Sequence, residues 1–161
     1  MKFYHASMSS RILRRYWEIF NEKLNVLLSF AYTGPDFLEI LITFRNTVSC
    51  VILDSGAWSV AKGNVNLTVE ELIAYLKVNG HLFDRFFNLD SDFSTSGFLN
   101  NIVNQIKMER AGLRPVPVVH NLFDHEIDFY VLSGKYDWIA LGSSQTTNYD
   151  DLAYAVHRIK T

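Results

Sequence analysis

The sequence predicts an α/β fold built on a parallel sheet, and two patterns in the chain predict it. Nearly continuous apolar runs, such as residues 25–30 and 116–119, are typical of strands that are covered on both faces. A helix-like stretch follows each run, and neither a linker nor a change in composition interrupts the alternation. Strands that alternate with helices in this way form one α/β domain, expected here over residues 1–161.

About six units of a strand and a following helix can be placed along the chain. The expected strands are residues 2–5, 25–32, 49–54, 85–90, 115–120 and 138–142. The expected helices, in the same order, are residues 10–23, 36–46, 69–79, 97–111, 125–133 and 150–159. Pro117 is unfavourable inside a central strand because proline removes a donor from the hydrogen-bond ladder. Right-handed crossovers would wind the sheet in one sense.

Local signals mark the ends of these helices. Thr68 and Glu71 have the spacing of a capping box ahead of the third helix, and Gly80 suits the C′ position at its end. The other expected caps, turns and stops are Ser9 or Ser10, Gly34-Pro35, Gly112, Gly134 and Asn148. The stretch between residue 54 and Thr68 is expected to be a loop.

The charge and cysteine content of the chain limit the kinds of surface and compartment that it is expected to have. The net charge is −2 and no block of like charges occurs, so the strong basic patch of many nucleic-acid-binding proteins is absent. Arg11, Arg14 and Arg15 come closest, and a solvated helix face is favoured over phosphate contact. The only cysteine, Cys50, opens an apolar strand, which predicts a buried thiol in a reducing compartment.

Nothing in the sequence indicates export or membrane insertion. The N-terminus lacks the charged region and apolar core of a signal peptide, and no apolar stretch is long enough to cross a bilayer. The sequence therefore predicts a cytoplasmic protein without a membrane partner.

Polar residues follow the apolar runs at the points where the expected strands end. The third run ends in Asp54-Ser55-Gly56, and the others end in His5, Tyr32, Asp90, His120 and Gly142. Parallel strands bring their carboxyl ends to one edge of the sheet, where α/β proteins usually place their chemistry. These residues therefore predict one catalytic mouth assembled from several strand ends.

The segment Leu53-Asp54-Ser55-Gly56-Ala57 resembles the Asp-Ser-Gly-Gly/Ala signature of tRNA-guanine transglycosylases. It is closer still to their shorter phage and bacterial relatives, which are linked to deazapurine (queuosine-type) modification of nucleic acid. Residues 87–90, 112–120 and 136–142 agree in order and character, so the resemblance covers about residues 25–142. It implies a TIM-like (β/α)₈ barrel, of which this chain supplies about six units. It also implies a pentosyltransferase that exchanges a purine or deazapurine base on tRNA or DNA, in the host cytoplasm if the chain is phage-encoded.

The chain departs from that family in its last units. The final two strands, the aspartate nucleophile and the structural zinc ligands of the family have no counterpart, and Ser143 stands where a second glycine is usual. We therefore expect no zinc and no other cofactor. An incomplete barrel leaves sheet edges exposed, so we expect a homo-oligomer or a partner chain that completes it.

The resemblance implies roles for individual residues. Asp54 would hold and protonate the departing base, and Asp90 would read its Watson–Crick edge. Ser55 and Gly56 would let a flat base approach the backbone, and Gly142 and Ser143 would offer backbone donors to its carbonyl. The remaining expected substrate contacts are Asn88, His120 and an aromatic side chain from Tyr32, Trp58 or Phe93.

Other interpretations of the same residues stay open. Asp54, Asp90 and Asp92 could cap turns, His5 and His120 could bond only to backbone, and Trp58 and Trp138 favour the core. His5, Asp54, Asp90 and His120 could instead bind a divalent metal in a barrel hydrolase. A third possibility is a non-catalytic subunit that binds a base or nucleic acid. A second carboxylate facing Asp54 would favour catalysis over that third possibility, and Asp90 is the only internal candidate.

Overall fold

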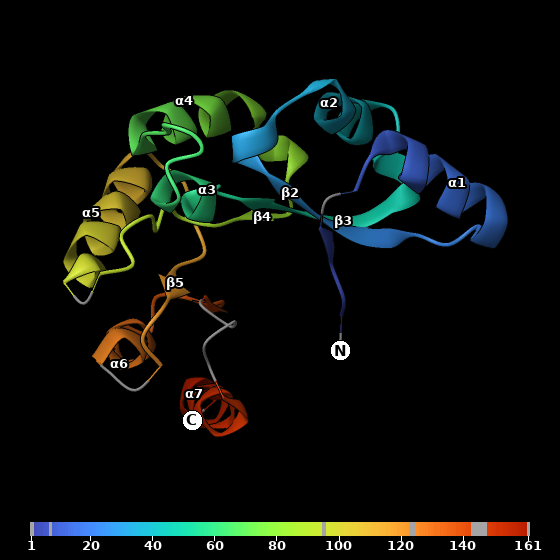
Figure 1. The fold of residues 1–161 in the computed structure, drawn as a ribbon. Helices are drawn as coiled ribbons and strands as arrows, with labels where there is room; N and C mark the ends of the chain where they lie inside the picture. The colour runs from blue at the N-terminus through green and yellow to red at the C-terminus, as the bar shows by residue number, and fades with distance from the viewer. Residues whose placement is uncertain (1, 7, 95, 123–124, 143–147, 161) are drawn as a thin grey trace.

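The computed structural model describes residues 2–6, 8–94, 96–122, 125–142 and 148–160, and its strands are parallel and follow chain order (Figure 1). One sheet contains β1 (His5–Ala6), β2 (Leu24–Ser29), β3 (Val48–Asp54) and β4 (Arg85–Phe86), and a second contains β5 (Val118–Val119) and β6 (Ala140–Leu141). A parallel bridge between Phe87 and Val116 joins the two sheets. The predicted α/β fold with a parallel sheet is confirmed.

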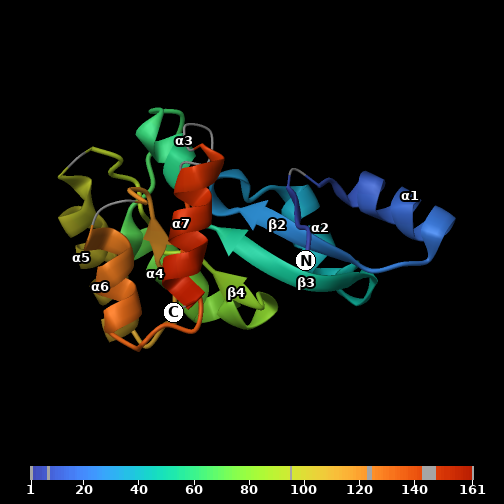
Figure 2. The ribbon, with the colours of Figure 1, turned by 90° about the horizontal axis from the view of Figure 1, so that it is seen from below.

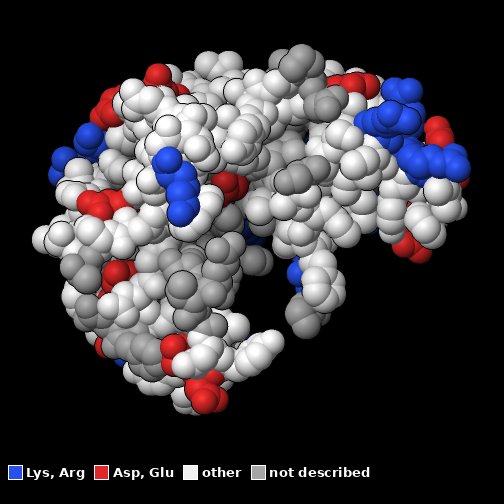
Figure 3. Space-filling model, in the orientation of Figure 1, with Lys and Arg blue, Asp and Glu red and all other residues white. Residues whose placement is uncertain are grey.

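Helices follow the strands in the order that the sequence predicts. They are α1 (Ser10–Phe20), α2 (Pro35–Ile42), α3 (Ala57–Ala61), α4 (Val69–Asn79), α5 (Gly97–Arg110), α6 (His125–Leu132) and α7 (Tyr149–Lys160). Short 3₁₀ turns span Phe30–Tyr32, Arg45–Thr47 and Gly80–Leu82. Figure 1 shows the longer helices along the outside of a curved row of strands, with α1 near one end and α7 at the other, and Figure 2 shows the same row from below. The space-filling view in Figure 3 shows the hollow that this curve encloses.

The hydrogen-bonded strands are shorter than the apolar runs that predict them. β2 ends at Ser29 because residues 30–32 turn into a 3₁₀ helix, and β4 ends at Phe86 rather than at Asp90. β1 and β6 are also reduced to two residues each. Pro117 limits β5, since it can use only its carbonyl, which accepts the Ala140 N–H at 2.9 Å.

Most of the predicted helix ends are confirmed. Thr68 and Glu71 make both bonds of the capping box, with Thr68 N–H donating to Glu71 Oε2 at 2.8 Å. Ser9 and Asn148 cap their helices, and Gly112 and Gly134 adopt left-handed φ values of +85° and +60°. The prediction for Gly80 is wrong: its φ is −58°, because the chain continues from α4 into a 3₁₀ turn.

The core lies in two clusters of buried side chains. The larger one packs α1, α2 and α4 against one face of β2 and β3, around residues such as Val26, Val51 and Leu53. The smaller one lies around β5, α6 and α7 and includes Val119 and Tyr130. Alternate residues of β2, including Leu27 and Ser29, point away from the larger cluster. This alternation places Ser29 and its register partner Asp54 on the same face of the sheet.

Cys50 is a half-buried free thiol that accepts a hydrogen bond from the Tyr4 hydroxyl at 3.5 Å, not the fully buried residue that the sequence predicts. Among the described residues, no helix is both long enough and apolar enough to cross a bilayer.

Candidate functional site

Asp54 lies at the carboxyl end of β3, beside Ser29 at the end of β2. Its Oδ2 accepts the Gly56 N–H at 3.0 Å, so the turn-capping interpretation of Asp54 is confirmed. Burial raises the pKa of the Asp54 carboxyl, hydrogen bonds from Ser29 and Gly56 N–H act in the opposite direction, and the nearby Asp90 charge raises it further. A half-buried carboxyl with a raised pKa is a better proton donor at a given pH than an ordinary aspartate, because more of it is protonated.

Asp90 joins the ends of three strands through its two carboxylate oxygens. Ser55 Oγ, after β3, donates to Asp90 Oδ1 at 3.4 Å, and His120 Nε2, after β5, lies 2.5 Å from Asp90 Oδ2. Asp90 is only 4% exposed, so its charge depends on these partners for stabilisation. The structure therefore brings together Asp54, Ser55, Asp90 and His120, four residues that sequence patterns predict for one site.

His120 is held from several sides. A Cβ atom at Gly142 would lie 2.6 Å from both Nδ1 and Cε1 of the His120 ring, so only glycine leaves room for the imidazole. Phe93 meets the ring edge-on at a centroid distance of 4.5 Å. The His120 backbone N–H donates to Glu126 Oε2 at 2.9 Å. These contacts fix the ring that faces Asp90.

The predicted role of Gly142 as a backbone donor to substrate is wrong. Its N–H donates to the Val119 carbonyl at 2.8 Å and is part of the hydrogen bonding between β5 and β6. The glycine matters instead for the space that it leaves beside His120. Ser143, the second expected donor, lies outside the described residues.

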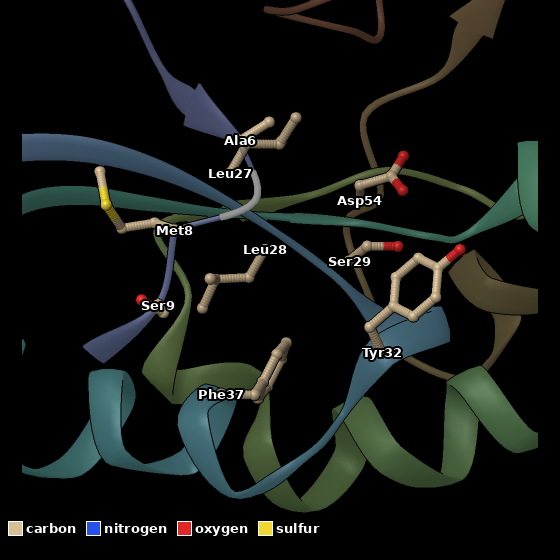
Figure 4. A pocket seen from close by; sticks show the side chains of 9 residues that line it. All are labelled: Ala6, Met8, Ser9, Leu27, Leu28, Ser29, Tyr32, Phe37 and Asp54. Atoms are coloured by element: carbon tan, nitrogen blue, oxygen red, sulfur yellow. The ribbon is translucent and has the colours of Figure 1, made fainter. Parts of the chain in front are cut away.

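A pocket of about 500 Å³ opens beside Asp54 (Figure 4). Figure 4 shows Asp54, Ser29 and Tyr32 together at one side of it and apolar side chains at the other. The lining residues are Ala6, Met8, Ser9, Leu27, Leu28, Ser29, Tyr32, Phe37 and Asp54. A volume of this size, mostly apolar with a few polar groups, is typical of a small-molecule site.

Exposed aromatic rings surround the strand ends. Trp58 of α3 is 56% exposed, its ring centroid lies 5.8 Å from that of Phe93, and Lys62 Nζ lies 4.6 Å from it. Tyr32 is exposed and its hydroxyl lies 3.1 Å from Ser59 Oγ. The preference for a core position is wrong for Trp58, and also for Trp138, which is 49% exposed against the Arg85 guanidinium.

The structure keeps two predicted site residues away from this cluster. Asn88 is fully buried, and its side chain points to α5, where Nδ2 donates to the Asn101 carbonyl at 3.3 Å. His5 is exposed on β1, where its register partner is Val26 and not Ser29, the residue beside Asp54. Among the described residues, no group of three or more His, Cys, Asp or Glu side chains is arranged to hold a metal ion. The four metal ligands considered from sequence therefore do not form a site in the described structure.

Asp92 caps its own loop. Its carboxylate accepts the Ser94 N–H, the Ser94 hydroxyl and the Asn100 amide, and these bonds lower its pKa. The loop-capping interpretation of Asp92 is confirmed.

Sequence reasoning missed three contributors to the site. The sequence predicts Ser29 inside a longer strand, and it predicts a loop at α3 because five residues are too few to show a helical period. In the sequence, Glu126 looks like an ordinary acidic residue in the first turn of a helix. In the structure, its carboxylate accepts hydrogen bonds from the backbone N–H groups of both His120 and Asn121. Only an Asp or Glu near the start of α6 could have indicated it, and that signal is common.

Comparisons with known proteins give no relative for this chain. No protein-family model matches it, and neither the curated proteins nor the solved structures include a significant match.

Proposed function

We propose that the cluster at the strand ends binds a purine or deazapurine base and serves glycosyl (base) exchange on tRNA or DNA. The observation that carries the proposal is the convergence of Asp54, Ser55, Asp90 and His120 from three successive strand ends. These residues belong to separate segments that each resemble tRNA-guanine transglycosylase-like proteins. The sequential parallel strands and the external helices support a further proposal, that the arc is part of a TIM-like barrel.

Base exchange requires an acid that holds and protonates the base as it leaves. Asp54 fits this role because burial raises its pKa and because it lines an open pocket. Ser55 and Gly56 are buried, and Gly56, with φ of +81° and a Cβ position 2.8 Å from Ala31 Cβ, is required by the packing on Ala31, so the base would approach Asp54 from the pocket. Tyr32, Trp58 and Phe93 supply rings that could stack on it.

The Asp90–His120 pair supports recognition of the edge of the base. The His120 side chain is 15% exposed and the Asp90 side chain 6%, so we expect the imidazole to meet the base and Asp90 to orient it. The hydrogen bond between His120 Nε2 and Asp90 Oδ2 fixes the orientation of the imidazole ring. We therefore assign contact with the base to His120 and positioning of His120 to Asp90. This differs from the sequence analysis, in which Asp90 itself reads the edge of the base.

Described residues can account for recognition of the base and for proton transfer to it. None of them is assigned as the nucleophile that base exchange requires. Asp90 is near enough for its charge to raise the Asp54 pKa, but its oxygens are engaged by Ser55 and His120. A subunit that binds the base without exchanging it would share this binding site. Exchange therefore has to be measured separately from binding.

Calorimetric titration with guanine and 7-deazaguanine tests the binding step. We expect saturable binding by the wild type and by Asp137→Asn, an exposed aspartate before β6, and loss of binding in folded Asp54→Asn. Absence of binding to folded wild type would overturn the proposal. Incorporation of labelled guanine into tRNA or DNA then distinguishes the two forms: binding with incorporation identifies an exchange enzyme, and binding alone identifies a non-catalytic subunit.

A further inference from the structure

The two described sheets leave an unpaired strand edge at each end of the arc. β1 pairs only with β2, and β6 pairs only with β5. The helices nearest to these edges are α1 and α7, which Figure 1 places toward opposite ends of the arc. Unpaired strand edges favour association with another strand.

α1 has an apolar stripe that nothing in the described structure covers. Ile12, Ile19 and Phe20 are each more than half exposed. Tyr16 borders them, with its ring 4.8 Å from that of Phe20, and is itself partly buried against the larger core cluster. Leu13, at 1% exposure, marks the packed side of the helix, which borders the exposed residues on the side of Phe20. The exposed residues stand at positions i, i+7 and i+8, a spacing that places them along one side of a helix, where they can pack on a neighbour.

α7 carries a second exposed stripe. Tyr149, Leu152, Ala153 and Val156 have the spacing i, i+3, i+4 and i+7, and all are exposed. Ala155 is fully buried and marks the side that packs on the rest of the chain. The two helices at the two open edges therefore share an unpartnered apolar face of similar length.

The charges beside the two stripes run in opposite order. On α1, exposed Arg11 and Arg15 come first and exposed Glu18 follows; Arg15 and Glu18 also pair with each other at 3.3 Å. On α7, exposed Asp150 comes first and Lys160 follows at the end. When two such helices lie parallel, each basic end meets an acidic end. Neighbouring helices in a run of parallel βα units are themselves parallel, so this arrangement continues the fold.

We propose that the open end of the arc formed by β6 and α7 binds the open end formed by β1 and α1 in a second copy of this chain. The contact places α7 beside α1 of the next copy and β6 beside β1, with Asp150 near Arg11 and Arg15 and with Lys160 near Glu18. It is head-to-tail, so it uses two different surfaces of each chain and leads to a closed ring or a longer assembly. The inference does not depend on the base that the strand-end site binds.

Charge reversal tests this contact by multi-angle light scattering on a sizing column. Wild type is expected to elute with the mass of a dimer or a larger assembly, and Arg11→Glu/Arg15→Glu and Asp150→Arg each with the mass of one chain. An equimolar mixture of the two variants restores both kinds of contact, acidic α1 with basic α7 and native α1 with native α7. We therefore expect the mixture to recover the wild-type mass.

The control is Lys77→Glu/Arg110→Glu, which makes the same change in net charge at exposed positions on α4 and α5 and should leave the assembly intact. Ile12→Ser/Ile19→Ser changes exposed residues, so the chain should fold and remain monomeric. A monomeric wild type would overturn the proposal. An assembly that survives the reversals, or a mixture that fails to reassociate, would also overturn it.

Discussion

Asp54 holds its proton more tightly in the folded chain than in the unfolded chain, because burial raises its pKa. A carboxyl of this kind stabilises the folded chain fully at pH values below its ordinary pKa. That contribution is lost as the pH rises from the ordinary value, about 3.9, through the raised folded value. The free energy of unfolding of the wild type should therefore fall over this window relative to Asp54→Asn, whose amide does not titrate.

Urea unfolding of both proteins at a series of pH values measures this difference. The Asn side-chain oxygen can still accept the Gly56 N–H, so the variant should not show the loss of about 0.5–2 kcal/mol that removal of a cap causes. Two stability curves that stay parallel across the acid range would show that Asp54 is not buried as described.

Gly142 gives a second prediction for a single residue. A methyl group there would lie 2.6 Å from His120 Nδ1 and Cε1, so Gly142→Ala must displace the ring from Asp90. We expect a loss of about 1–3 kcal/mol of stability, the usual cost of overpacking, together with weaker base binding. Thermal denaturation and the NMR signals of the His120 imidazole report the two effects. Unchanged imidazole signals in the alanine variant would contradict the packing of His120 on Gly142.

A substitution at Gly80 tests how helix α4 ends. Its φ is −58°, and a methyl group on its Cα would meet only open space, so alanine fits there without strain. Gly80→Ala should stabilise the chain by about 0.4–1 kcal/mol, because alanine reduces the freedom of the unfolded chain. The free energy of unfolding of the variant, measured in denaturant, distinguishes this right-handed conformation of Gly80 from the left-handed C′ conformation that the sequence predicts. A left-handed C′ glycine would make the same substitution destabilising.

The elements also show where sequence reasoning succeeds. The boundaries of α4 are predicted correctly because the Thr68–Glu71 box is local and involves only residues three apart. The strands are overestimated because an apolar run records burial, whereas a strand needs a partner at the right register. Asp54, Ser55, Asp90 and His120 are found because each follows an apolar run. Their hydrogen bonds span 30 and 35 residues of sequence, and no local pattern specifies them.

At the scale of the whole molecule, the two hydrophobic cores lie on two sheets that differ in the extent of their strand pairing. β2 pairs with β3 from Leu24 to Ser29, whereas β5 and β6 pair at only two positions. Between the two sheets, the Phe87–Val116 bridge is flanked by hydrogen bonds from Val116 N–H to the Phe86 carbonyl at 2.8 Å and from Asn88 N–H to the Val116 carbonyl at 3.1 Å. A part of a protein with fewer backbone hydrogen bonds opens at lower free energy.

Hydrogen exchange should therefore divide the chain at this bridge. The amides of β2 and β3 are expected to exchange most slowly, near the rate set by global unfolding, and those of β5, β6 and α6 to exchange faster as a group. The site straddles the division, since Asp54 and Ser55 follow β3 and His120 follows β5. A base that bridges Asp54 and His120 should consequently slow exchange in the second group more than in the first. Equal protection of both groups without ligand would contradict the division, and equal slowing with guanine would contradict a base held across it.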